Sequence, residues 1–321
     1  MIFENQVRKL YQKTLFVRND NADGIFYFQP SDFPGLECHP YSFPAKAGHA
    51  LKGYFYHYAQ VIPGRLVVFD HGMGNGHRAY MREIERLAQA GWLVFSYDHT
   101  GCMESGGTGT NGFAQSLSDL DACLTALEKE DALRERTISV VGHSWGGFST
   151  MNIAALHPGI THVVSMSGFI SVEKMLEQTF AGPMKGYREP IMALERRVNP
   201  DYVNFNAIKT LSETTAKVLL IYSADDSVIH KALHYDPLEK ALAGKDNVRF
   251  LLLSGKDHNP TYAPDAVKYK NTFFTQLKSA RKHKLLSTPE NQRAFMSRFD
   301  WWRMTEQDDR VWEAINAHLQ S

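Results

Sequence analysis

The stretch Val140-Val141-Gly142-His143-Ser144-Trp145-Gly146-Gly147 decides the fold. Apolar and β-branched residues from Thr137 to Val141 lead into it and predict a short buried strand. A helix is expected to follow from about Phe148 to Leu156. Between strand and helix, Gly142-x-Ser144-x-Gly146 is typical of a nucleophile elbow, a strained turn that exposes a serine. Glycines are needed there because side chains two residues to either side would collide with the neighbouring strand and helix.

Strands and helices alternate on both sides of this turn. Strands are predicted at residues 25–29, 51–58, 65–70, 93–97, 137–141, 162–166, 217–222 and 248–253. Helices are predicted between several of them, at 78–90 and 113–130, whereas residues 30–49, rich in Pro and Gly, are expected to form a long loop. This alternation predicts an α/β fold with an eight-stranded, mostly parallel sheet flanked by helices on both faces.

The composition excludes several classes of protein. The 321 residues are 43% hydrophobic, which suffices for a sizeable core, and 35 basic residues balance 35 acidic ones. Nothing therefore indicates a nucleic-acid partner or an anionic membrane surface. Three scattered cysteines indicate free thiols in a reducing compartment. Neither a signal peptide nor a membrane span is visible, so a cytoplasmic protein is expected.

A serine hydroxyl needs an imidazole to take its proton and a carboxylate to orient that imidazole. In a parallel sheet such groups should lie at the carboxyl ends of strands. The seventh predicted strand runs into Asp225 and Asp226, and the eighth runs into Asp257 and His258. The sequence thus offers His258 as the base and three carboxylates that could orient it.

Several motifs together resemble the α/β-hydrolase superfamily, in its serine esterase, monoglyceride lipase and serine aminopeptidase branches. Asp70-His71-Gly72-Met73-Gly74 resembles the His-Gly-x-Gly loop after strand three, and Tyr97-Asp98-His99-Thr100-Gly101 resembles the motif after strand four. Ala224 to Ile229 resembles the acid loop, whose pattern Gly-x-x-Asp-x-x-Val has the acid as its fourth residue. Ser223 stands in place of the glycine, and this alignment selects Asp226. The resemblance covers about residues 50–260, with Thr100 where arginine is usual.

The resemblance implies an α/β-hydrolase fold with a small helical cap. Residues 1–169 and 214–321 would form the core, with an N-terminal extension and a C-terminal helical tail, and residues 170–213 would form the cap. It also implies that the backbone N–H groups of Met73 and Trp145 form the oxyanion hole.

The cap segment carries apolar side chains that could face a substrate. Met175, Phe180 and Met184 are candidates for an acyl pocket, because methionine adapts its shape and aromatic rings line apolar sites. The alternative is that these side chains only hold the cap to the core.

Other reactive residue types near the elbow are given structural roles. The resemblance implies that His71, His99 and His143 do not take the serine proton, and no motif places a base beside Cys102. The glycine-rich stretches at 71–76 and 106–109 lack the Gly-Lys-Ser/Thr ending of a phosphate loop. No metal ion or cofactor is predicted.

The sequence therefore predicts a serine hydrolase that cleaves carboxylic ester bonds of a small-molecule substrate through an acyl-enzyme. Ser144 would attack the carbonyl, His258 would accept and return the proton, and Asp226 would orient His258. Amide or peptide hydrolysis and acyl transfer remain open alternatives, because the same residues serve all three reactions. A binding protein that has lost catalysis is the alternative from another class.

Overall fold

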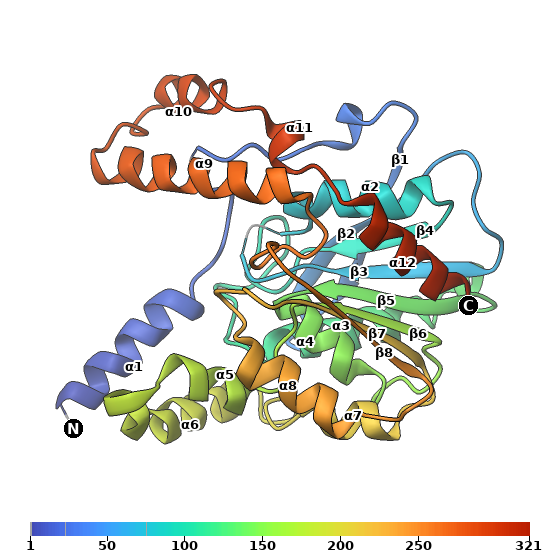
Figure 1. Cartoon of the computed structure of the whole chain (residues 1–321), viewed down its shortest axis with the longest axis horizontal. Coiled ribbons are helices and arrows are strands. Elements are labelled where there is room, and N and C mark those ends of the chain that lie inside the picture. Colours follow the sequence, from blue (N-terminus) through green and yellow to red (C-terminus); the bar gives the residue numbers. More distant parts are fainter. Residues whose placement is uncertain (1, 23, 75) are drawn as a thin grey trace.

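The computed structural model describes residues 2–22, 24–74 and 76–321 and is built around an eight-stranded sheet (Figure 1). The strands are β1 (Glu37–Pro44), β2 (Ala50–His57), β3 (Arg65–Asp70), β4 (Leu93–Tyr97), β5 (Thr137–His143), β6 (His162–Met166), β7 (Lys217–Ser223) and β8 (Val248–Leu253). Their order in the sheet is β1-β2-β4-β3-β5-β6-β7-β8. The β1–β2 and β2–β4 pairs are antiparallel and the other pairs are parallel. The predicted fold class is therefore confirmed.

Helices cover both faces of the sheet. The helices in the first half are α1 (Ile2–Leu15), α2 (Met81–Gln89), α3 (Gln115–Leu127) and α4 (Trp145–Ile153). Those between β6 and β8 are α5 (Val172–Thr179), the 3₁₀ turn η4 (Gly182–Tyr187), α6 (Arg188–Val198), α7 (Ala207–Glu213) and α8 (Lys231–Ala241). The tail holds α9 (Pro264–Lys282), α10 (Pro289–Met296), α11 (Trp301–Met304) and α12 (Asp309–Gln320). Figure 1 shows α2 and α12 on one face, and α3, α4, α7 and α8 on the other.

The central strands are mostly apolar because both of their faces are buried. On β3, Leu66 and Val68 belong to the apolar cluster that includes side chains of α3 and α4. Val67 and Phe69 point the other way and belong to the cluster that includes side chains of α2 and α12. The side-chain alternation of a strand thus divides one apolar run between two layers of helices.

The prediction of a strand at residues 25–29 is wrong. Residues 25–29 form no strand, and the outermost strand is β1, inside the predicted loop 30–49. Phe26 and Phe28 alternate as in a strand, but Phe28 packs edge-on against Trp302 of the tail, with ring centroids 4.8 Å apart. Pro40 within β1 is tolerated because β1 is an edge strand, where one side of the backbone pairs with no other strand.

The C-terminal tail after β8 is helical. Side chains of α9 and α10, among them Phe273, Leu277 and Phe295, form a small apolar cluster of their own. Beyond it, α12 returns to the sheet beside β6 and β7, and Trp312 is buried in the apolar cluster on that face. In the part of the chain that the structure describes, no helix combines the length and apolarity that crossing a bilayer requires.

Candidate active site

Ser144 stands at the junction of β5 and α4 in a strained backbone conformation. Its φ of 57° and ψ of −109° place it in a region that non-glycine residues rarely adopt. A Cβ atom on Gly146 would collide with the carbonyl oxygen of Asp70, and one on Gly142 would collide with the carbonyl oxygen of Gly146. The steric reason predicted for these two glycines is confirmed. The turn holds Ser144 beyond the carboxyl end of the central strand β5.

A chain of hydrogen bonds joins the serine to a carboxylate. His258 Nε2 lies 2.9 Å from Ser144 Oγ. His258 Nδ1 lies 3.0 Å and 3.1 Å from the two carboxylate oxygens of Asp226. Because an ionised carboxylate only accepts, Nδ1 carries the proton and Nε2 is left to accept from the serine hydroxyl. The structure thus brings together the three residues proposed from the sequence.

The neighbouring carboxylates are engaged elsewhere. Asp225 accepts hydrogen bonds from the Ser223 hydroxyl at 2.6 Å and from the Gly255 amide at 2.8 Å. Asp257 accepts from the amide and hydroxyl of Ser227. Neither is hydrogen-bonded to His258, so Asp226 is the carboxylate in position to orient the imidazole.

Asp226 is held in its ionised form. Its Oδ1 accepts the backbone N–H groups of Val228 at 2.9 Å and Ile229 at 2.8 Å. Burial opposes the charge, but the hydrogen bond and charge of His258, together with these two amides, keep the pKa of Asp226 below its ordinary value. A charged carboxylate in this position would stabilise a positive charge on the His258 ring.

A second histidine supports the loop that carries His258. His143 Nε2 donates to the backbone carbonyl of His258 at 2.7 Å, and the Tyr80 hydroxyl donates to His143 Nδ1 at 2.9 Å. Burial, with the charge of His258, lowers the pKa of His143 to about 3, so this imidazole is neutral. The sequence placed His143 beside the nucleophile but offered no sign of this bond, which links residues 115 positions apart.

The two backbone N–H groups predicted to form the oxyanion hole are those of Trp145 and Met73. Trp145 is the first residue of α4, where helix amides have no intrahelical partner. Met73 lies in the loop after β3. Within residues 2–22, 24–74 and 76–321, neither the Met73 nor the Trp145 amide donates a hydrogen bond. Both donors of the predicted oxyanion hole are therefore unpaired, and their role stays a prediction.

Two other histidines hold the strand-end loops together. His71 donates from Nδ1 to the Gly72 carbonyl at 2.6 Å and accepts the His99 amide on Nε2 at 3.0 Å. His99 is buried, yet the carboxylates of Asp70 and Asp119, within 3.0 Å and 3.3 Å of its ring, raise its pKa to about 10. Among the hydrogen bonds of the described residues, neither ring is bonded to the Ser144 hydroxyl.

Cys102 is also unsuited to nucleophilic chemistry. Its side chain is fully buried, and burial together with the charges of Asp98 and Asp119 raises the pKa of its thiol. The reactive thiolate is therefore disfavoured.

The proposed pocket residues fall into two groups. Met175 and Phe180 are buried in the large apolar cluster on the α3–α4 side of the sheet. The Phe180 ring lies 6.2 Å from the ring of Tyr11 in the N-terminal helix. Met184, in η4, is 40% exposed at the surface. Contact of these residues with a substrate stays a prediction.

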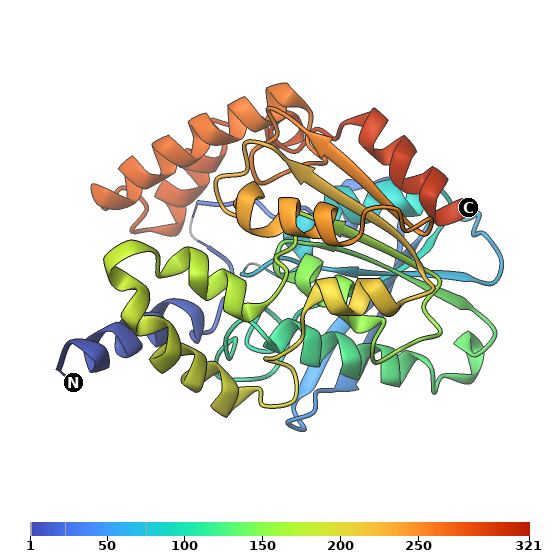
Figure 2. The same cartoon turned by 60° about the horizontal axis from the view of Figure 1, so that its bottom comes forward.

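The segment proposed as a cap contains helices with different neighbours. Helix α7 contacts α4 and α8, which cover the sheet, whereas α6 contacts α5 and the N-terminal helix α1. Figures 1 and 2 both show α1 beside α6 and away from the strands. The domain division at 170–213 stays a prediction, and α1 would belong to the same layer as α5 and α6.

A buried glutamate joins this layer to the elbow. Glu195 of α6 accepts the Tyr11 hydroxyl of α1 at 2.6 Å and the Phe113 amide at 3.1 Å. The carbonyl of Phe113 in turn accepts the indole N–H of Trp145 at 2.6 Å. Burial raises the pKa of Glu195 from its ordinary 4.5 to about 7. Nothing in the local sequence marked this link, because its three parts come from distant segments.

The Glu195→Gln variant should show how this carboxyl affects stability. Because its folded pKa is raised, the folded state holds the proton more tightly, and stability is lost as pH rises from 4.5 to 7. We expect the free energy of unfolding of wild type, relative to E195Q, to fall over that range by an amount on the order of 3 kcal/mol. Urea unfolding of both proteins across this range measures the difference, and a constant difference would contradict the assignment.

Comparisons with known proteins agree with the fold of this chain. Residues 62–204 match the family model described as serine aminopeptidase, S33. An esterase of Pyrococcus furiosus is similar in structure, with a TM-score of 0.58, 18% identity, and coverage of 84% of this chain and 98% of that one. The esterase domain of a Rhodothermus marinus protein has a TM-score of 0.51 and 16% identity, covering 77% of this chain and 98% of its own. The α/β-hydrolase GrgF of a Penicillium species has a TM-score of 0.52 and 14% identity, with coverage of 81% and 99%.

Proposed function

We propose that this chain, whose fold is that of the α/β-hydrolases, is a serine hydrolase that cleaves carboxylic ester bonds. The observation that carries the proposal is the continuous chain of hydrogen bonds from Ser144 through His258 to Asp226. The esterases among its structural neighbours add support for an ester substrate.

In the first half of the reaction, Ser144 Oγ attacks the acyl carbonyl carbon while His258 Nε2 takes the hydroxyl proton. Asp226, bonded to Nδ1, stabilises the positive charge that develops on the ring. The negative charge on the carbonyl oxygen would be stabilised by the N–H groups of Met73 and Trp145. The imidazolium then protonates the alcohol leaving group, and the acyl-enzyme is formed.

In the second half, water repeats the same steps on the acyl-enzyme. His258 Nε2 takes a proton from water as its oxygen attacks the acyl carbon, and the proton is returned to Ser144 Oγ as the acid leaves. Each step needs His258 neutral at its start, with Nε2 free to accept. The hydrogen bond from Nδ1 to Asp226 supports that tautomer.

Amide hydrolysis is the second candidate, and one observation favours it. The family model that matches residues 62–204 is described as a serine aminopeptidase. The same three side chains would cleave an amide, with His258 protonating an amine as it leaves.

A substrate panel separates these candidates. We expect kcat/KM to be higher for p-nitrophenyl esters than for aminoacyl p-nitroanilides, because the proposed substrate is an ester. Esters from acetate to long acyl chains would locate the preferred chain length. Faster cleavage of the anilides would contradict the ester assignment, and diversion of the acyl group from water to an added alcohol would identify an acyltransferase.

A further inference from the structure

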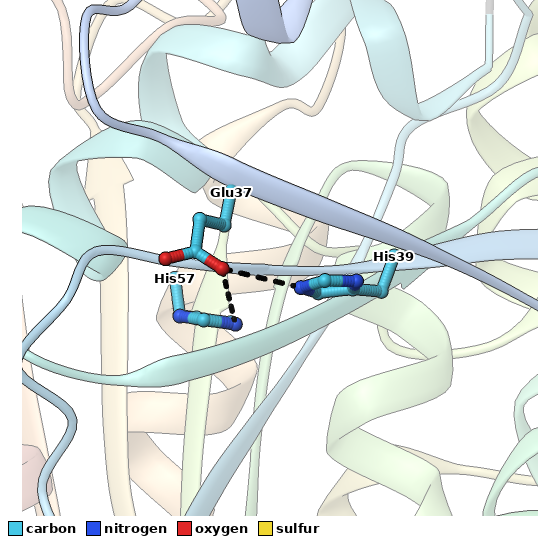
Figure 3. A group of neighbouring side chains, drawn as sticks. All are labelled: Glu37, His39 and His57. Atoms are coloured by element: carbon cyan, nitrogen blue, oxygen red, sulfur yellow. Dashed lines mark ion pairs between the residues drawn. The ribbon is translucent and has the colours of Figure 1, made fainter.

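A group of potential metal ligands lies on the edge of the sheet farthest from β8. Glu37 and His39 are two residues apart on β1, so their side chains share one face. His57 of β2 pairs directly with Glu37 across the hairpin. Figure 3 shows the carboxylate of Glu37 directed between the two imidazole rings.

The ligating atoms converge. Glu37 Oε2 lies 3.4 Å from His39 Nε2 and 3.9 Å from His57 Nε2. All three atoms lie within 4.8 Å of one another, and the two rings stack with centroids 5.4 Å apart. Three atoms with lone pairs are unfavourable at this spacing unless a proton or a cation lies among them.

One of the rings is already oriented for coordination. His57 Nδ1 lies 3.0 Å from the carbonyl oxygen of Tyr58, which can only accept, so Nδ1 carries the proton. The lone pair of His57 therefore resides on Nε2, the atom that faces Glu37. Metal-bound histidines usually donate their other ring N–H to such a carbonyl.

We propose that Glu37, His39 and His57 form a binding site for a divalent transition metal ion, with Zn²⁺ as its representative. Two imidazoles and one carboxylate suit zinc better than magnesium or calcium, which prefer oxygen ligands. With bonds of about 2.0–2.1 Å, tetrahedral zinc places its ligand atoms about 3.3–3.4 Å apart, which the Glu37–His39 pair already satisfies. A water molecule would complete the coordination.

The other ligand atoms must move slightly closer together to bind zinc, since Glu37 Oε2 and His57 Nε2 are 3.9 Å apart. His39 is 60% and Glu37 53% exposed, so rotation about their side-chain bonds can draw the nitrogens together. Cys38 lies between them in sequence but packs toward the opposite face of the sheet, so no thiolate competes for the ion.

The site is structural because it is remote from Ser144. Tyr56, next to His57, pairs with Val94 near the start of β4, so this group lies at the amino ends of the parallel strands. Ser144 follows the carboxyl end of β5. A bound ion would link β1 to β2 at the exposed edge of the sheet and stabilise that hairpin against opening.

Titration of the full-length protein with Zn²⁺ by isothermal calorimetry tests the proposal. We expect one equivalent to bind to wild type, and the affinity to fall by at least about tenfold in both His39→Ala and Glu37→Gln. The matched control His283→Ala removes an exposed imidazole from the end of α9 and should bind like wild type. Zinc should also raise the Tm of wild type and of H283A more than that of H39A or E37Q.

Circular dichroism of the metal-free variants confirms that they are folded, which their exposed positions favour. Absence of stoichiometric zinc binding in wild type would overturn the proposal. Binding that is unchanged in both H39A and E37Q would also overturn it, because the ion would then occupy another site.

Discussion

Replacing Ser144 with alanine is expected to lower kcat for ester hydrolysis by about 10⁴- to 10⁶-fold. The hydroxyl is the only proposed nucleophile, and no other side chain is hydrogen-bonded to His258 Nε2 in the part of the chain that the structure describes. Alanine would experience the same strain at a φ of 57° as serine does, so the free energy of unfolding should change by less than about 1 kcal/mol. Steady-state kinetics and urea unfolding measure the two quantities.

The Ser212→Ala variant is a matched control. Its hydroxyl is exposed on α7 and donates only to the backbone carbonyl of Lys209, so both activity and stability should remain close to wild type. Wild-type turnover in folded S144A would contradict the proposed nucleophile, whatever the stability of the variant.

The Asp226→Asn variant is expected to lower kcat by about 10⁴-fold while leaving the acid loop in place. The asparagine oxygen can still accept the amides of Val228 and Ile229. Its NH₂ group, directed at His258 Nδ1, would favour the tautomer with the proton on Nε2, which cannot accept from the Ser144 hydroxyl. Kinetics at saturating ester measure the loss of kcat.

The two neighbouring carboxylates provide the controls. Asp225→Asn and Asp257→Asn should each change kcat by less than about tenfold, because neither side chain is hydrogen-bonded to His258. Asparagine also tolerates the φ of 47° at position 257. A loss in either variant as large as that in D226N would mean that the orienting carboxylate has been misassigned.

The central sheet and the elbow were predictable because the sequence patterns that specify them are local. The apolar run before Ser144 and the glycines at 142 and 146 act within a few residues of each other. The proximity of Asp226 and His258 was also predictable, since each follows a strongly apolar strand whose carboxyl end meets the same edge of the sheet.

The N-terminal region was predicted less well because distant contacts decide it. Phe26 and Phe28 have the alternation of a strand, but they pack against Trp301 and Trp302, more than 270 positions away. The prolines of β1 predicted a loop, and only pairing with β2 makes it a strand. The Glu37–His39–His57 group was missed for the same reason, because it depends on the register of that hairpin.

The contacts that support the site also could not be predicted from local sequence patterns. The bond from His143 to the His258 carbonyl and the link from Tyr11 through Glu195 to Phe113 each join segments that meet only in the folded chain. Their residue types are common in ordinary helices and turns, so spacing along the chain could not identify them.

Reaction with a fluorophosphonate probe, followed by mass spectrometry, tests the central claim most directly. We expect one covalent adduct per chain, located on Ser144 within the tryptic peptide of residues 137–174. The adduct should be absent from S144A and strongly reduced in His258→Ala, because the hydroxyl reacts only when the imidazole accepts its proton. A folded, ester-cleaving protein that acquires no adduct, or acquires it on a residue other than Ser144, would contradict the proposed mechanism.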